Sequence, residues 1–207
     1  MPIRAVVFDL GGVLVDWNPE YVYRELIPDQ EQRQWFLEHV CNSTWNVQQD
    51  AGRSLAEGTT ELLEKHPEHA MWIRAFYGRW TEMLAGELPE GIALLETLQD
   101  AGLPLYALTN WSAETFPYAR KNLPFLQLFR DILVSGELGL IKPNPAIYHK
   151  MQQRIAVDLP GIAPEEIAFI DDAAHNIRAA CNLGWQGVHH IDIHATRAAL
   201  RQHGLPV

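Results

Sequence analysis

Four short stretches of the chain carry residues of the types that bind phosphate and metal ions. They are, in chain order, Asp9 with Gly11 and Gly12, Thr109 with Asn110, Lys142, and Asp171 and Asp172 with Asn176. Each stretch follows, directly or after a loop, an apolar run of the length of a buried strand. Because ligands bind outside the carboxyl ends of parallel strands, we expect the four stretches to converge on one rim of a sheet.

These residue types fit phosphoryl transfer through a covalent aspartyl phosphate. A carboxylate nucleophile splits one difficult step into two easier ones, and Asp9 is the candidate. Mg²⁺ prefers oxygen ligands and needs only one or two carboxylates, which Asp9 and Asp172 would supply. The remaining groups are donors that would hold the phosphoryl oxygens. They are Thr109, Lys142 and backbone N–H groups near Gly11, Gly12 and Asn110.

Each stretch also has an interpretation without a ligand. An aspartate at a strand end is often a helix or turn cap, and Asp171 and Asp172 could cap the helix that follows them. Glycines after Asp9 let the backbone approach a phosphate closely, but they also fit a tight turn. The order of all four stretches, each after a strand, favours the chemical interpretation.

The pattern of apolar residues predicts how these stretches are positioned. Strands are predicted at Ile3–Phe8, Leu103–Leu108, Asp131–Val134, Ile167–Ile170 and Gly187–His190. Helices are predicted between or after them, at Glu90–Asp100, Ala113–Asn122, Pro145–Ile155, Ala173–Leu183 and Ala195–His203. This alternation is typical of βαβ units and predicts an α/β fold with a doubly wound parallel sheet.

A second kind of pattern interrupts the first. Residues 17–87 have helical spacing with many aromatic anchors, broken at Pro28 and Pro67. We therefore predict an α/β core at 1–16 and 88–207 and an inserted helical domain at 17–87.

Three further residues are candidates for contact with a substrate. Asp16 lies at the entry into the insertion, and Trp111 directly follows the second stretch. Arg53 lies in the loop-like stretch 45–53, which also contains Asp50. The tryptophans of the insertion fit the core of a helical bundle, and a substrate pocket is the alternative.

Composition limits the partners. The 207 residues include 16 basic and 26 acidic ones, a net charge of −10, and no block of lysines or arginines. This argues against nucleic-acid binding. The N-terminus has no signal-peptide pattern and no apolar run is long enough to span a bilayer, so we expect a cytoplasmic protein that binds no membrane. The expected partner is a small phosphorylated molecule; the sequence carries no signal of oligomeric state.

Together the four stretches resemble the motifs of the haloacid dehalogenase (HAD) superfamily, which consists mostly of Mg²⁺-dependent phosphohydrolases. They read FDLGGVL at residues 8–14, LTN at 108–110, KP at 142–143 and IDDAAHN at 170–176. The helical insertion at 17–87 lies where members with a small helical cap domain carry it. The resemblance therefore implies a catalytic core and a cap whose opening and closing would admit substrate and exclude water. The resemblance implies that Asp9 is the nucleophile. It implies that Asp9, Asp172 and the Gly11 carbonyl are metal ligands, supported by Asp171 and Asn176. It further implies that Thr109 and Asn110 bind phosphate and that Lys142 is the lysine of the third motif.

One position departs from the superfamily pattern. Most of its phosphatases have a second aspartate two residues after the nucleophile, as general acid and base, and here that residue is Gly11. General acid–base catalysis contributes about 10²–10⁴-fold. The pattern FDLGxV resembles a branch with glucose-1-phosphate phosphatases, whose anomeric leaving group is a good one. Asp16 and His175 are candidates for a replacement acid.

Two alternatives remain. A 2-haloacid dehalogenase also uses an aspartate nucleophile and lacks the second aspartate, but it attacks carbon and needs no metal, so it would not need both Asp171 and Asp172. A binding module that has lost catalysis is the other alternative, and Gly11 is the feature in its favour.

Overall fold

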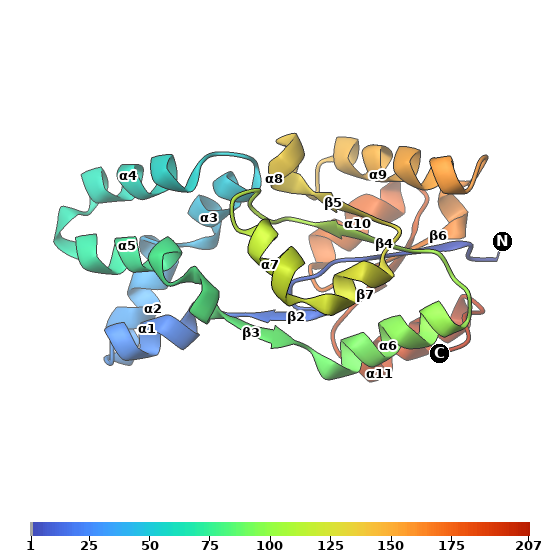
Figure 1. Cartoon of the computed structure of the whole chain (residues 1–207), viewed down its shortest axis with the longest axis horizontal. Helices are drawn as coiled ribbons and strands as arrows, with labels where there is room; N and C mark the ends of the chain where they lie inside the picture. The colour runs from blue at the N-terminus through green and yellow to red at the C-terminus, as the bar shows by residue number, and fades with distance from the viewer. Residues whose placement is uncertain (1) are drawn as a thin grey trace.

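The parallel sheet lies at one end of the molecule in the computed structural model, which describes residues 2–207. Within these residues the sheet has five strands (Figure 1). Their spatial order is β5 (Asp131–Val134), β4 (Leu105–Thr109), β1 (Ala5–Phe8), β6 (Ile167–Asp171) and β7 (Gln186–His189). All neighbouring pairs are parallel, which confirms the predicted α/β fold class.

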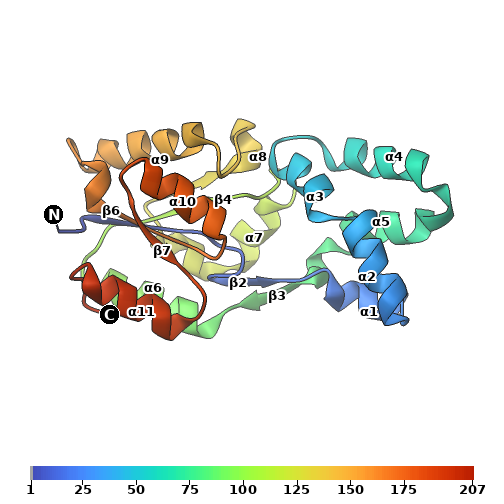
Figure 2. The ribbon, with the colours of Figure 1, turned by 180° about the vertical axis from the view of Figure 1, so that it is seen from behind.

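Helices cover both faces of the sheet because the strands are apolar on both faces. Val6 and Phe8 of β1 pack in one cluster with α6 (Pro89–Asp100), α7 (Phe116–Asn122) and α11 (Ile193–Gln202). Ala5 and Val7 pack on the opposite face with α9 (Pro145–Asp158) and α10 (Ala174–Asn182). Figure 2 shows α9 and α10 on one side of the sheet and α6 and α11 on the other.

The helical segment has an apolar core of its own. Its helices are α1 (Glu20–Leu26), α2 (Gln30–His39), α3 (Ser43–Asp50), α4 (Leu55–Lys65) and α5 (Ala70–Gly78). Tyr23, Phe36 and Phe76 are fully or almost fully buried between them. The aromatic anchors are therefore mostly core residues, although Trp35 is exposed and Trp80 packs with the core of the sheet domain.

A two-stranded antiparallel ribbon joins the two parts, and the sequence pattern did not predict it. It pairs β2 (Val15–Trp17) with β3 (Leu84–Glu87), where the sequence predicted only helical structure up to Gly86. Strands of this length are too short to show a period of two, so the sequence pattern could not indicate them. Both predicted boundaries, 16/17 and 87/88, fall in or beside this ribbon, so we propose that it divides the core from the cap.

Two strands end one residue later than the sequence predicted, and this changes how the site residues are held. β4 extends to Thr109 and β6 to Asp171, so both residues belong to strands rather than to loops. The register places Phe8 beside Ala107 and Ile170, and Asp9 therefore emerges at the same edge as Thr109 and Asp171.

The remaining elements are short. The helix α8 (Ser135–Leu138) follows β5 directly and was not predicted. Single 3₁₀ turns lie at η1 (Pro67–His69), η2 (Trp80–Met83), η3 (Pro124–Leu128) and η4 (Pro164–Glu166). Across residues 2–207, none of the helices has the length and apolar character that crossing a membrane requires.

Candidate active site

An ammonium group between two carboxylates forms the centre of the site. Lys142 Nζ lies 2.9 Å from Asp9 Oδ2 and 2.6 Å from Asp171 Oδ2, and only 1% of the lysine side chain is exposed. Asp9 follows β1, Asp171 ends β6, and Lys142 comes from the loop after α8. The lysine therefore ties together two neighbouring strand ends.

Asp171 has no carboxylate oxygen free of protein partners. Besides Lys142, it accepts hydrogen bonds from Asn176 Nδ2, 3.1 Å from each oxygen, and from the backbone N–H of Ala173 at 2.8 Å. These bonds fix the buried carboxylate, which in turn orients Lys142. Asn176 Oδ1 is buried without a hydrogen-bond partner in the described residues, which leaves an acceptor within the site.

Asn110 of the second motif holds Lys142 of the third motif in place. The Asn110 side chain accepts from the backbone N–H of Lys142 at 2.8 Å and donates to the Lys142 carbonyl at 3.0 Å. The Asn110 side chain is therefore occupied in positioning Lys142, and only its backbone N–H remains for a ligand. Thr109 is buried beside it and lines the cavity described below.

The site has more negative charge than its single lysine balances. Burial raises the pKa of Asp9 to about 7, against the opposing effect of Lys142. Burial, and then the charge of Asp171, raises the pKa of Asp172. For Lys142 burial lowers the pKa, but Asp9 and Asp171 outweigh it, and the pKa is raised. A cation near Asp9 and Asp172 would favour their ionised forms.

The donor set fits a hard divalent cation. Asp9, Asp171 and Asp172 each offer a carboxylate oxygen, and these atoms lie within 4.8 Å of one another. Because Asp171 is already fully hydrogen bonded, Asp9 and Asp172 are the two carboxylates available as ligands. Such an all-oxygen set with few carboxylates is the kind that Mg²⁺ takes.

Gly12 has a steric reason to be glycine. Its φ is +70°, and a Cβ there would lie 2.4 Å from Asp172 Oδ2. A side chain at this position would displace one of the two candidate ligands. Gly11 differs, because a Cβ there would meet nothing within 4 Å. The absence of a side chain at Gly11 is therefore not required by packing.

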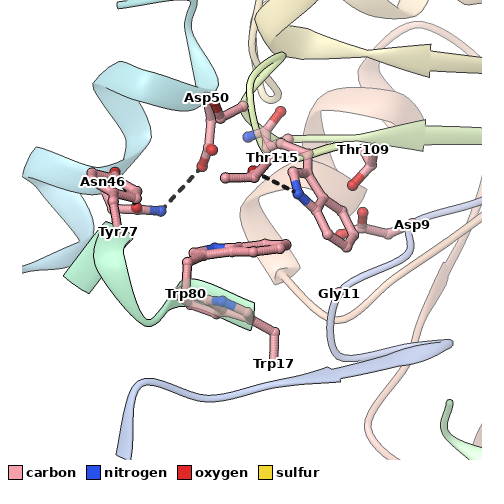
Figure 3. Close-up of a pocket in the computed structure, with 12 residues that line it drawn as sticks. Asp9, Gly11, Trp17, Asn46, Asp50, Tyr77, Trp80, Thr109 and Thr115 are labelled. Carbon is pink, nitrogen blue, oxygen red and sulfur yellow. Dashed lines mark hydrogen bonds between the residues drawn. The ribbon is translucent and has the colours of Figure 1, made fainter. Parts of the chain in front are cut away.

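A cavity of about 120 Å³ opens between the strand ends and the cap (Figure 3). Both parts of the chain contribute to its walls. The core provides Asp9, Gly11, Thr109, Asn110, Trp111, Ser112 and Thr115, and the ribbon and cap provide Trp17, Asn46, Asp50, Tyr77 and Trp80. Four aromatic rings and several hydrogen-bonding groups thus surround the candidate nucleophile.

Three of the predicted residues lie elsewhere, although all belong to the part of the chain that the structure describes. Asp16 does not line the cavity, and its carboxylate accepts from the Tyr21 hydroxyl at 2.7 Å. Arg53 is engaged inside the cap by Glu61 and by Gln49 Oε1. His175 is exposed in the first turn of α10. Trp111, in contrast, lines the cavity.

The structure also brings in a carboxylate to which the sequence analysis assigned no role. The loop-like stretch around Asp50 is in fact helix α3, and Asp50 is its last residue. The Asp50 side chain points into the cavity from the cap side (Figure 3). An Asn42 side-chain cap on the Trp45 N–H starts this helix, a signal that was readable in the sequence. Which face of the helix meets the core was not readable.

Comparison of the chain with known proteins finds a family whose model it matches. The model of the haloacid dehalogenase-like hydrolases matches residues 3–184. A sesquiterpene phosphatase of Aspergillus oryzae is 28% identical over 200 residues, which cover 96% of this chain and 95% of that protein.

Solved structures share the fold at lower identity. A HAD family enzyme of Bacteroides thetaiotaomicron, in a magnesium complex, has a TM-score of 0.66 at 24% identity and covers 91% of this chain and 93% of its own. The L-2-haloacid dehalogenase of Xanthobacter autotrophicus has a TM-score of 0.63 at 17% identity, with 99% and 85% coverage.

Proposed function

The chain belongs to the haloacid dehalogenase-like hydrolase family, and on that premise we propose that it is a Mg²⁺-dependent phosphatase that hydrolyses a small phosphorylated metabolite through an aspartyl phosphate on Asp9. The observation that carries this proposal is the Lys142 ammonium between Asp9 and Asp171, with Asp172 left free as a second metal ligand. A nucleophile, a cation for the phosphoryl oxygens and an all-oxygen metal site lie at one edge of the sheet.

Each group of the site has a defined task in this reaction. The Asp9 carboxylate attacks phosphorus, and Lys142 neutralises charge on the phosphoryl oxygens and orients the nucleophile. Thr109 and the backbone N–H groups near Gly11, Gly12 and Asn110 would hold the same oxygens. Bound Mg²⁺, held by Asp9, Asp172 and the Gly11 carbonyl, would screen the negative nucleophile from the negative phosphate.

The lining of the cavity supports a small polar substrate, and a sugar phosphate is the first candidate. Trp17, Trp80 and Trp111 offer flat faces, while Asn46 and Asp50 offer groups that bond hydroxyls. An adjoining cavity of about 390 Å³ shares Trp17, Asn46 and Asp50 with the first and is lined in part by apolar side chains. It would suit an isoprenoid phosphate instead, and the Aspergillus relative is named as a sesquiterpene phosphatase.

A 2-haloacid dehalogenase is the second candidate function. Gly11 and the shared fold with the Xanthobacter enzyme favour it. The free carboxylate of Asp172 argues against it, because an unmetallated site would gain nothing from a third acid beside Asp9 and Asp171. A binding module without catalysis stays the third alternative.

The test is phosphate release from a panel of sugar 1-phosphates, sugar 6-phosphates, nucleotides, an isoprenoid phosphate and 4-nitrophenyl phosphate, with and without Mg²⁺. We expect release that stops on addition of EDTA, returns with Mg²⁺, and is abolished in Asp9→Asn. Activity like that of the wild type in Asp9→Asn would refute the mechanism.

The other outcomes separate the alternatives. Halide release from 2-chloropropionate that is indifferent to EDTA would establish the dehalogenase. A folded protein that binds Mg²⁺ but turns over neither class would establish the binding module.

A further inference from the structure

We propose that Asp50 is the general acid and base of this enzyme, supplied by the cap in place of the aspartate that the family pattern puts at Gly11. This inference rests on the phosphatase function proposed above and adds a residue to its mechanism. Three observations carry it: where the Asp50 carboxyl lies, how few partners it has, and how the cap is held against the core.

The Asp50 carboxyl lies in the same cavity as the nucleophile but on the cap side. Asp9 and Gly11 belong to the core side of this cavity, and Asp50 enters it from the end of α3, with its carboxyl beside Asn46 (Figure 3). A leaving group must point away from the attacking carboxylate, because attack and departure at phosphorus are in line. An acid for the leaving oxygen must therefore reach the side of the phosphorus that is turned away from Asp9, which a carboxyl on the cap side can do.

This carboxyl is not committed to a structural ion pair. None of the ion pairs among residues 2–207 includes Asp50. Its side chain receives one hydrogen bond from Asn46 Nδ2 at 3.3 Å, which is long, and the rise in its pKa is opposed only by the backbone N–H of Ser112. A part-buried carboxyl with so little compensation is costly to keep unless it has a function.

The protonation behaviour of the group agrees with this role. Burial raises the pKa of Asp50 to about 7, and the backbone N–H of Ser112 opposes the rise. A general acid works best when its pKa is near the working pH. Of the groups around it, Tyr77 on α5 has its own pKa raised, chiefly by burial, and Arg53 is held by Glu61 and Gln49.

The other candidates for the acid do not fit as well. Asp16 and His175 do not line the cavity. The Tyr77 hydroxyl lines it, but it donates to Asn46 Oδ1 and accepts from Gln49 Nε2, both at 2.9 Å. Because burial raises the pKa of Tyr77, its phenol is a weaker acid than an ordinary tyrosine.

The proton balance of the reaction then closes with Asp50. As Asp9 Oδ forms its bond to phosphorus, the bond from phosphorus to the leaving oxygen breaks, and protonated Asp50 gives its proton to that oxygen to release the alcohol. The Asp50 carboxylate next takes a proton from a water molecule as that water attacks the phosphorus of the aspartyl phosphate. Inorganic phosphate leaves, Asp9 is a carboxylate again, and Asp50 is protonated for the next cycle.

Contacts between the cap and the core hold Asp50 in this place. Its backbone carbonyl accepts from Ser135 Oγ of α8 at 2.6 Å, and the same Oγ accepts from the Trp111 N–H at 2.9 Å. A second bond joins the two parts nearby, from the Leu55 N–H to Glu114 Oε1 at 2.8 Å. The acid is thus in position only when the cap is docked, so that closure would assemble the complete catalytic set.

The test compares Asp50→Asn with the wild type on phenyl phosphate and 4-nitrophenyl phosphate, in the presence of Mg²⁺. The leaving group of phenyl phosphate is the more basic and needs the proton more. We expect kcat/KM for phenyl phosphate to fall about 10²–10⁴-fold, and kcat/KM for 4-nitrophenyl phosphate to fall at least about tenfold less. The ratio kcat/KM is used because it covers the steps up to departure of the leaving group.

A rescue variant and a control accompany this comparison. In Gly11→Asp/Asp50→Asn a carboxyl returns on the core side, where a Cβ meets nothing within 4 Å, and we expect the phenyl phosphate activity to recover in part. Glu38→Gln removes an exposed carboxyl of the same domain and should leave kcat/KM unchanged for both substrates. Circular dichroism checks that each variant is folded.

The outcomes that would overturn the proposal are specific. Equal losses on the two substrates would mean that Asp50 has only a structural role, and unchanged kcat/KM values would mean that it has none. Either result, obtained with an active wild type, refutes the proposed role of Asp50 but not the phosphatase function. A wild type that hydrolyses neither aryl phosphate nor any member of the panel would refute the phosphatase and this proposal together.

Discussion

Lys142 is the residue of the site whose side chain is most constrained by its surroundings. Its ammonium group is buried between Asp9 and Asp171, and neither carboxylate has another cation within ion-pair distance in residues 2–207. Removing one partner of a buried ion pair is far more damaging than removing an exposed one, because the remaining charges stay buried and uncompensated. The lysine therefore has a structural task in addition to its catalytic one.

For Lys142→Met we expect the free energy of unfolding to fall by about 3–5 kcal/mol, the usual cost of breaking a buried pair, and activity to be lost. Urea unfolding at pH 7 measures the first effect. Lys150→Met, which removes an exposed lysine of α9, is the matched control and should be neutral within about 0.5 kcal/mol. Equal stability of the two variants would show that the buried pair contributes nothing.

Asp50 gives a pH dependence of stability whose sign follows from its raised pKa. The folded state holds this proton more tightly than the unfolded chain, so ionisation costs folding free energy as pH rises from about the usual value of 3.8 toward 7. Below that window the carboxyl is protonated in both states and costs nothing.

We therefore expect Asp50→Asn to melt at a higher temperature than the wild type at pH 8 and at nearly the same temperature at pH 4. The gain at pH 8 should be roughly 1–2 kcal/mol, since the group is part-exposed and solvent screening reduces the effect. Thermal melts across this pH range check it. A gain that grew as pH fell would contradict the raised pKa.

At the scale of elements, the short helix α8 links the cap to the sheet domain. Ser135 begins this helix, is fully buried, and joins α3 to the loop after β4 through its hydroxyl. The neighbouring Gly136 packs so closely that a Cβ would lie 2.5 Å from the Ala113 N atom. The surface on which the cap docks against the sheet domain is therefore closely packed and depends on few groups.

In Ser135→Ala the Trp111 N–H loses its acceptor and the Asp50 carbonyl loses its donor. We expect a loss of about 1–3 kcal/mol in the free energy of unfolding, the cost of leaving a buried donor unpaired, together with a lower kcat/KM. Denaturant unfolding and steady-state kinetics measure the two effects. Thr81→Ala, at an exposed threonine, serves as the control, and a Ser135→Ala protein indistinguishable from it would argue against docking through this hydroxyl.

At the scale of the whole molecule, charge opposes the proposed substrate. The chain carries a net charge of −10, and the one buried lysine of the site is already paired with two carboxylates. A phosphate ester therefore meets a repulsive long-range field before it reaches groups that attract it.

This repulsion predicts that salt accelerates capture of the substrate. Raising the NaCl concentration from about 20 to 200 mM shortens the range of the field, and we expect kcat/KM for an anionic substrate to rise about two- to fivefold at fixed Mg²⁺. Initial rates at low substrate concentration measure it. A steady fall with salt would instead mean that local positive potential at the strand ends governs binding.

Much of the fold could be predicted from sequence because its signals are local. The runs at β1, β4 and β6 are mostly apolar, as parallel strands buried on both faces must be, and the glycines and prolines between elements mark their ends. The ribbon of β2 and β3 could not be predicted, since its strands are too short to show a period of two. Arg53 was expected at the substrate because its stretch was interpreted as a loop that could face the site, but its partners, Glu61 and Gln49, lie within the cap.

The family, the sheet and the set of residues at the strand ends could be recognised from the sequence. The carboxyl ends of parallel strands must meet at one edge, and Asp9, Thr109 and Asp171 each end a strand or follow it directly. The three-dimensional fold fixed which oxygens are free for a metal, since that depends on the bonds that already occupy Asp171. It also decided that Asp50, rather than Asp16 or His175, lines the same cavity as Asp9. The rotation of α3 and the docking of the cap on Ser135 fix that choice, and both depend on contacts between residues far apart in the chain.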